Sequence, residues 1–281
     1  MSFGPNPWQQ TQWDWRAAGN FIGGGAGGGL VMLTAVSGVQ GTAAALLLAA
    51  GLALVGLGLV CVWAELGRPL RAMNVFFNPR TSWMARESIA ATLLMPVGVI
   101  AAYLVWAGAA NIVWLAGLLA LAFIVCQSRM LQGARGIVAW REPLSVQLLL
   151  ATSLAEGAGL ILLALPWHGS PFAALLVVVL VLARAGIWLL YRQRLAGRLA
   201  PRAKAALDGA GRVLMIGGTL LPLLLVAASY AVAWPVFAAL AGLLAAVSGS
   251  YMKFVLVTRA GYNQGFALEQ VPVRGARWTA G

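Results

Sequence analysis

Histidine and cysteine are nearly absent from this sequence. Its 281 residues include one histidine, His168, and two cysteines, Cys61 and Cys126, which are far apart in the chain. A membrane b-type haem usually takes two axial histidines, an iron–sulfur cluster about four thiolates, and a structural zinc site about four ligands of these types. We therefore expect no haem, no iron–sulfur cluster and no metal site within this chain.

Charge is also scarce, and acidic residues are the scarcest. Charged side chains make up 9% of the sequence, with 19 Lys and Arg against 7 Asp and Glu, whereas 61% of the residues are hydrophobic. Uncharged runs of about 20 residues predict a polytopic membrane protein rather than a soluble domain. The formal charge of +12 would suggest nucleic acid in a soluble protein. Here the basic residues cluster between apolar runs, so we expect no nucleic-acid binding.

The apolar runs predict an all-α integral membrane protein with eight transmembrane helices. The predicted spans are 17–38, 43–64, 83–107, 110–131, 144–165, 171–191, 209–233 and 235–258. The split between the last two depends only on Trp234 and Pro235. The N-terminal fifteen residues contain no basic segment followed by a short apolar core, so we expect no cleavable signal.

The connections between these spans alternate in charge. Those after spans one, three, five and seven are short and carry no Lys or Arg, whereas the others are longer and basic. The positive-inside rule therefore predicts that the basic face and both termini are cytoplasmic. The opposite face has only short loops, so we expect soluble partners to dock on the basic face. The basic residues assigned to docking are Arg71, Arg80, Arg192, Arg194 and Arg198.

The connection from Ala64 to Glu87 is the most polar stretch between two spans. It contains Glu65 and Arg68, and an amphipathic repeat suited to lying flat on the bilayer. Two interpretations remain open, a working surface for a ligand and a loop whose arginines bind lipid phosphate.

The first span is rich in glycine and contains one amide. Gly23, Gly25 and Gly28 satisfy the dinucleotide pattern G-x-G-x-x-G, but no strand precedes them, so we reject that interpretation. Small residues four apart, such as Gly19 and Gly23, predict close approach by a neighbouring helix or a flat ligand. Asn20 lies about one turn inside the membrane and needs a polar partner, either another helix or a ligand.

Two carboxylates lie within predicted spans. Glu87 follows Arg86, and because adjacent helical residues do not face each other, we expect Glu87 to point inward, where it can exchange protons with a ligand. Glu156 lies near the middle of span five, and Arg184 lies at a depth that it can reach. This pair is either a buried ion pair or part of a proton path. We expect Lys253, near the end of its span, to extend its ammonium to the interface.

The block E-L-G-R-P-L-R-A-M-N at 65–74, followed by A-R-E at 85–87, resembles the membrane anchor subunits of dimethyl sulfoxide reductase. It is more distantly similar to the polysulfide-reductase and NrfD-like integral subunits. The N-terminal W-D-W-R-A-A-G-N-F-I-G-G-G is similar to subunits that accompany cytoplasmic oxidoreductases for sulfite or phenylacetyl-CoA. Many members of these families have His or Asp where this chain has Glu65.

The resemblance implies a two-bundle anchor in the bacterial inner membrane. Its soluble partners would be a four-cluster iron–sulfur subunit and a molybdopterin catalytic subunit on the cytoplasmic face, and it would exchange electrons with menaquinone or ubiquinone. The division of the chain would be an N-terminal interfacial segment 1–16, a first four-helix bundle 17–131, an interfacial loop 132–143, a second bundle 144–258 and a cytoplasmic tail 259–281.

The quinone site is expected in the first bundle, near the basic loops. A chain without its own redox centre must bring quinone close to the partner's last cluster. We expect Glu65 and Glu87 to exchange protons with the quinone, and Asn20 or Arg68 to bind its carbonyl oxygen. Two alternatives remain, a proton-coupled secondary transporter with Glu156 and Arg184 as its coupling site, and a purely structural anchor without a quinone site. Membrane lipids are expected partners.

Overall fold

In the described part of this computed structural model, eight helices are long and apolar enough to cross a membrane, which confirms the predicted number and the all-α class. The structure describes residues 6–65, 69–109, 112–165 and 171–265, without the side chains of 69–71 and 171. The first six spans are single helices: α1 (Trp15–Val36), α2 (Gly41–Trp63), α3 (Trp83–Trp106), α4 (Val113–Gly133), α6 (Leu144–Ala164) and α7 (Pro171–Arg194). The seventh joins α8 (Pro201–Arg212), η3 (Val213–Leu220) and α9 (Leu221–Val232), and the eighth is α10 (Pro235–Thr258).

Local sequence signals set the helix ends. The Asp14 side chain accepts from the Arg16 backbone N–H before α1, and the Ser82 hydroxyl accepts from the Ala85 N–H before α3, as N-caps do. Between α9 and α10, Ala233 adopts a left-handed conformation with φ of 53°, and Pro235 begins the next helix. The two last spans are therefore separate helices, as the sequence predicted.

The seventh span begins earlier than predicted. Pro201 occupies the start of α8, and the helix then runs without a break to Val232, whereas the apolar pattern placed its start at 209. The extra turns carry Arg202, Lys204 and Asp208. Apolar periodicity does not detect such polar turns, which extend a spanning helix beyond its apolar part.

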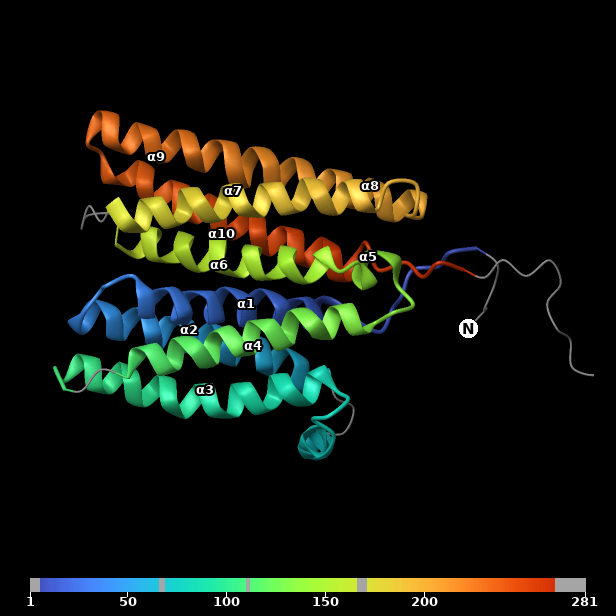
Figure 1. Cartoon of the computed structure of the whole chain (residues 1–281), viewed down its shortest axis with the longest axis horizontal. Helices are drawn as coiled ribbons and strands as arrows, with labels where there is room; N and C mark the ends of the chain where they lie inside the picture. The colour runs from blue at the N-terminus through green and yellow to red at the C-terminus, as the bar shows by residue number, and fades with distance from the viewer. Residues whose placement is uncertain (1–5, 66–68, 110–111, 166–170, 266–281) are drawn as a thin grey trace, which may run out of the picture.

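The spans lie side by side with their axes roughly parallel (Figure 1). Helix α1 packs against α2, α4, α6 and α10, and α6 packs against α7 and α10. Buried residues make up 67% of the apolar stretch of α1 and 72% of that of α6, but only 28% of that of α3. Helices α1 and α6 are therefore interior, although no charge pattern in the sequence distinguishes them from the outer spans.

The glycines of α1 allow this packing on three sides. A Cβ at Gly27 would collide with the backbone of α2 at Gly51, one at Gly28 with Ile124 of α4, and one at Gly29 with the carbonyl of Ser153 in α6. Close backbone approach requires small residues at such contacts. The predicted helix packing of the glycine stretch is thus confirmed.

Gly29→Ala is expected to destabilise the protein by about 1–3 kcal/mol, since the added methyl group must displace backbone in a packed interior. Gly186→Ala in α7 is the matched control, because a Cβ there meets nothing within 4 Å. The melting temperature in detergent should be lowered only by Gly29→Ala. Equal melting temperatures for the two variants would contradict the packing described for α1.

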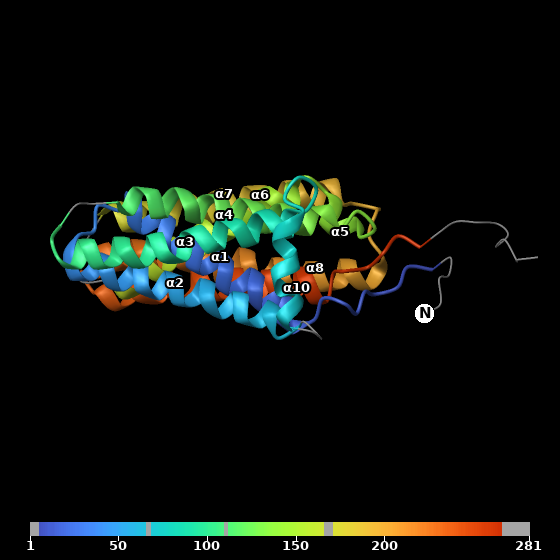
Figure 2. The same ribbon diagram turned by 90° about the horizontal axis from the view of Figure 1, so that it is seen from below.

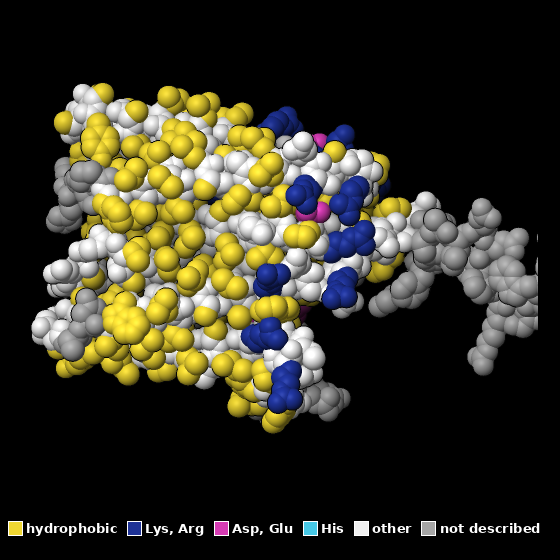
Figure 3. Space-filling model, in the orientation of Figure 1, with side chains coloured by type: hydrophobic (Ala, Val, Ile, Leu, Met, Phe, Trp, Pro, Cys, Tyr) yellow, Lys and Arg dark blue, Asp and Glu magenta, His cyan; other side chains and the backbone are white. Residues whose placement is uncertain are grey.

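The basic residues gather at one end of the bundle, which we call the basic end (Figure 3). It is formed by residues 6–14 and 259–265 and by the described parts of the connections after α2, α4 and α7. The C-terminal ends of α1, α3, α6 and α9 lie at the other end (Figure 1). A 3-10 helix, η1 (Pro69–Phe77), runs across the spans at the basic end and exposes Met73 and Phe77 (Figure 2). This orientation suits the amphipathic segment predicted there.

The two ends of the described chain meet at the basic end. Residues Gln9 and Tyr262 form an isolated antiparallel bridge, and the Trp8 N–H donates to Asn263 Oδ1 at 2.9 Å. The segment 132–143, expected as an interfacial loop, contains the short helix α5 (Val138–Arg141). Its Trp140 is only 2% exposed, and its indole N–H donates to the Leu256 carbonyl at 2.8 Å. This segment is therefore packed against α10.

Candidate functional site

Three polar side chains meet between α1, α3 and α4, close to the basic end. Asn20 Nδ2 donates to Glu87 Oε1 at 3.0 Å. Gln127 Nε2 donates to the same Glu87 oxygen at 3.2 Å and to the backbone carbonyl oxygen of Asn20 at 3.0 Å. None of the three residues is more than 4% exposed. We call this group the amide–carboxylate cluster.

The local helical geometry directs Glu87 inward. It lies one turn after the N-cap Ser82, whereas Arg86 donates to the carbonyls of Pro79 and Arg80 and lies over the Trp83 ring. The neighbouring arginine therefore faces a different direction and makes no ion pair with Glu87 in the described structure. The expectation of an inward carboxylate is confirmed.

The cluster lies at a shallow depth within the spans. Glu87 is four residues into α3, Asn20 five into α1, and Gln127 six from the end of α4. At 1.5 Å per residue, these positions are about 6–9 Å from the helix ends. A ligand bound here would lie just inside the apolar layer at the basic end.

The cluster combines hydrogen-bond donors with free acceptor capacity. Both amide NH₂ groups donate to Glu87 Oε1, but Asn20 Oδ1 is buried and accepts no hydrogen bond within the described part of the chain. A buried acceptor without a donor costs about 1–3 kcal/mol. The site can thus accept a hydroxyl hydrogen bond and can hold or release a proton at Glu87.

Glu65 belongs to a different group of charges. It is partly buried at the end of α2, beside Asp14 and Arg16, and Arg16 Nη1 donates to the Ala64 carbonyl at 3.0 Å. Partial burial, assisted by the negative charge of Asp14, raises the pKa of Glu65 above its usual value. No hydrogen bond connects Glu65 to Asn20 or Glu87 among the described residues. Of the four predicted quinone-binding residues, the structure brings together Asn20 and Glu87, and Arg68 lies outside the described residues.

A second buried polar group lies between α6 and α10 and differs from the predicted pair. Lys253 Nζ lies 2.5 Å from Glu156 Oε2 and 3.0 Å from Ser153 Oγ, and Ser250 donates to Glu156 Oε1 at 3.3 Å. In the described structure Arg184 makes no ion pair with Glu156, so the predicted Glu156–Arg184 pair is wrong. The prediction that Lys253 reaches the interface is also wrong, because Lys253 is 1% exposed.

Arg184 instead binds backbone carbonyls. Its Nη1 donates to Ala245 O at 2.9 Å and its Nη2 to Gly218 O at 2.5 Å. Gly218 lies in the π-helical segment η3, four residues before Pro222. Because proline has no N–H, it cannot satisfy the carbonyl four residues earlier. The guanidinium donates to that carbonyl instead, whereas the Arg184 Nε atom has no hydrogen-bond partner among the described residues.

The predicted docking arginines are not equivalent in the structure. Arg80 and Arg194 are exposed at the basic end. Arg192 forms an ion pair with Asp208 of α8, and Arg198 Nη1 lies 3.4 Å from Glu142 Oε2. The side chain of Arg71 lies outside the described part. Arg80 and Arg194 are therefore the exposed members of the five that form no ion pair among the described residues.

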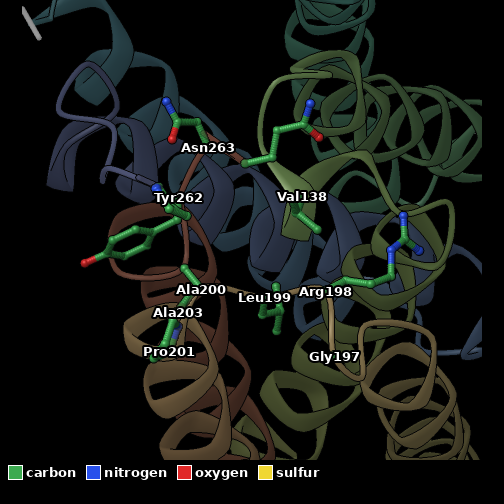
Figure 4. Close-up of a pocket in the computed structure, with 11 residues that line it drawn as sticks. Val138, Gly197, Arg198, Leu199, Ala200, Pro201, Ala203, Tyr262 and Asn263 are labelled. Atoms are coloured by element: carbon green, nitrogen blue, oxygen red, sulfur yellow. The ribbon is translucent and has the colours of Figure 1, made fainter. Parts of the chain in front are cut away.

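A hollow of about 220 Å³ lies where the two ends of the chain meet (Figure 4). Its lining includes Leu199 of the α7–α8 connection, Ala203 of α8, and the polar residues Arg198, Tyr262, Asn263 and Gln264. Tyr262 and Asn263 are engaged within the protein, since Tyr262 Oη donates to Gln9 Oε1 and Asn263 Oδ1 accepts from the Trp8 N–H. We regard this hollow as packing between the chain ends rather than as a ligand site.

Sequence reasoning missed two members of the buried groups. Gln127 is an amide in an apolar run, so the test applied to Asn20 would have found it. Lys253 was recognised as a charge near a helix end, but its orientation toward α6 depends on which helices are neighbours.

Among the described residues, no group of three His, Cys, Asp or Glu side chains lies close enough to hold a metal ion.

The sequence matches no protein-family model, and no curated protein matches it at a significant level.

Proposed function

We propose that this chain is the membrane anchor and quinone-reactive subunit of a multi-subunit oxidoreductase. It would exchange electrons between an iron–sulfur partner subunit and the membrane quinone pool. The observation that carries the proposal is the amide–carboxylate cluster, in which Glu87 is buried with two amides near the basic end. Reduction of a quinone consumes two electrons and two protons, so its site needs a group that exchanges protons as well as hydrogen-bonding groups.

The cluster has hydrogen-bonding groups for both redox forms. The NH₂ groups of Asn20 and Gln127 can donate to a quinone carbonyl oxygen, and Asn20 Oδ1, which has no donor among the described residues, suits the hydroxyl of a quinol. Glu87 would hold or release the proton. Glu65 and Arg68 remain proposed members of this site, with Glu65 exchanging protons nearer to the basic end.

The depth of the cluster supports electron exchange at the basic end. The first bundle would consist of α1 to α4 and hold the quinone, and the second would consist of α6 to α10. By the positive-inside rule, the basic end and both termini would face the bacterial cytoplasm. A four-cluster iron–sulfur subunit and a molybdopterin subunit would dock there on exposed arginines such as Arg80 and Arg194.

Purification in mild detergent tests the proposed assembly. The tagged chain should bring down subunits that contain iron, acid-labile sulfide and molybdenum in fixed proportion, and the complex should oxidise or reduce a water-soluble quinone analogue. A chain that purifies alone from cells grown under all respiratory conditions would contradict the anchor function. A complex that forms but has no quinone activity would support the purely structural anchor.

The buried Lys253–Glu156 pair supports a second candidate, a proton-coupled secondary transporter. Ionisable residues deep within membrane spans commonly mark ion or substrate pathways, and Arg184 lies in the same part of the protein. Solute accumulation by the isolated chain in vesicles, driven by a pH gradient, would favour this function. No accumulation, together with quinone activity of the complex, would exclude it.

A further inference from the structure

A second hollow, of about 630 Å³, opens at the basic end between α3, α4, the α4–α6 connection and the α7–α8 connection. Its lining includes Arg129, Arg135, Arg141 and Arg198, together with Glu142 and Trp83. We call it the arginine hollow. Its lining does not include the residues of the amide–carboxylate cluster.

The arginine hollow has more positive charge than its own carboxylate balances. Arg198 forms an ion pair with Glu142 at 3.4 Å, and Arg129 donates to the neutral Gln132 at 2.9 Å. Within the described ranges, no ion pair involves Arg129, Arg135 or Arg141. Several like charges around one partly enclosed space favour an anion there, since the walls screen charge less than bulk water does.

The position of the hollow identifies the kind of anion. Arg129 lies near the end of α4, and Trp83 lies at the start of α3 with Arg86 and Arg129 over its ring at 4.2 and 5.9 Å. Tryptophan is typical of the headgroup level of a membrane. Apolar side chains cover the bundle surface up to the arginines (Figure 3). A ligand with a phosphate at its head and acyl chains below matches this arrangement.

The Glu142 carboxylate narrows the choice of headgroup. Glu142 is 5% exposed, and its Oε1 atom accepts no hydrogen bond within the described residues. A ligand that carries a hydroxyl donor beside its phosphate would satisfy this oxygen while the arginines hold the phosphate in paired hydrogen bonds. We propose that the arginine hollow binds the phosphoglycerol headgroup of phosphatidylglycerol.

Native mass spectrometry of the delipidated protein, with any partner subunits that co-purify, tests this site. Titration with phosphatidylglycerol should saturate one site with at least tenfold higher affinity than phosphatidylcholine, and phosphatidylmethanol, which has the same charge but no headgroup hydroxyl, should bind less tightly. Equal affinity for the three lipids, or tighter binding of phosphatidylethanolamine, would overturn the proposal. Displacement of the lipid by millimolar inorganic phosphate would also overturn it, because the site would then bind a soluble anion.

Arg135→Gln with Arg141→Gln should reduce phosphatidylglycerol affinity at least tenfold. The matched control is Arg202→Gln with Arg212→Gln, which removes the same charge from exposed residues of α8. Equal losses in the two double variants would overturn the proposal. If the Gln variant does not fold, Arg135→Lys with Arg141→Lys retains the charge but removes the paired geometry, and unchanged affinity in that variant would overturn the proposal as well.

Discussion

Glu87→Gln is expected to lower quinone turnover of the assembled complex by about a hundredfold or more. Glutamine retains the size and the hydrogen-bonding shape of the side chain but cannot exchange a proton, and general acid–base groups typically contribute factors of about 10²–10⁴. The measurement is the steady-state rate with a quinol analogue, compared with the rate with an artificial dye that reacts directly with the partner subunits. The dye rate and the yield of complex should not change.

Asp208→Asn is the matched control for that substitution. It also converts a carboxylate to an amide at the basic end, but Asp208 is a surface residue paired with Arg192. Its quinone turnover should stay close to that of the unmodified complex. Unchanged quinone kinetics in Glu87→Gln would remove Glu87 from the proposed mechanism, and an equal loss of dye activity would indicate damage to assembly instead.

Lys253→Met is expected to destabilise the protein by about 3–5 kcal/mol, because it leaves the buried Glu156 carboxylate without its cation. Glu156→Leu should also destabilise it, since Lys253 then has only the Ser153 hydroxyl as a partner. The double variant Lys253→Met with Glu156→Leu should lose much less than the sum of the two, because apolar side chains can replace a buried ion pair. Equilibrium unfolding in mixed detergent micelles measures the three free energies of unfolding.

Lys204→Met is the control for this cycle, since Lys204 is an exposed lysine of α8. Its free energy of unfolding should change by less than about 0.5 kcal/mol. Additive losses in the double variant would contradict the direct pairing of Lys253 with Glu156. The transporter candidate makes a different prediction, because in that case the double variant would lose solute accumulation despite its recovered stability.

The spans were predictable because each depends only on neighbouring residues. About 20 apolar residues must form a helix in a bilayer, and the arginines between alternate spans indicate which ends lie together. The inward direction of Glu87 also follows from local geometry, since Arg86 beside it points elsewhere. Asn20 was identified because an amide within the apolar layer requires a hydrogen-bond partner. The sequence alone does not identify that partner.

The remaining features depend on which helices are neighbours. Lys253 meets Glu156 because α10 packs against α6. Helix α1 lies beside this pair, and its Gly25 makes room for it, since a Cβ at Gly25 would overlap Lys253 Nζ. Arg184 depends on the carbonyl of Gly218, which lies in a π-helical segment that apolar periodicity does not reveal. The arginine hollow likewise combines residues of α3 and α4 with residues of the α4–α6 and α7–α8 connections.

Photoaffinity labelling tests the central claim most directly, namely that quinone binds at the amide–carboxylate cluster near the basic end. The purified complex would be irradiated with a photoreactive quinone and its labelled peptides mapped by mass spectrometry, with excess natural quinone as the competitor. Competed labels should lie on α1, α3 and α4 around Asn20, Glu87 and Gln127. Competed labels confined to the opposite end, near residues 37–40 and 233–234, would contradict the account.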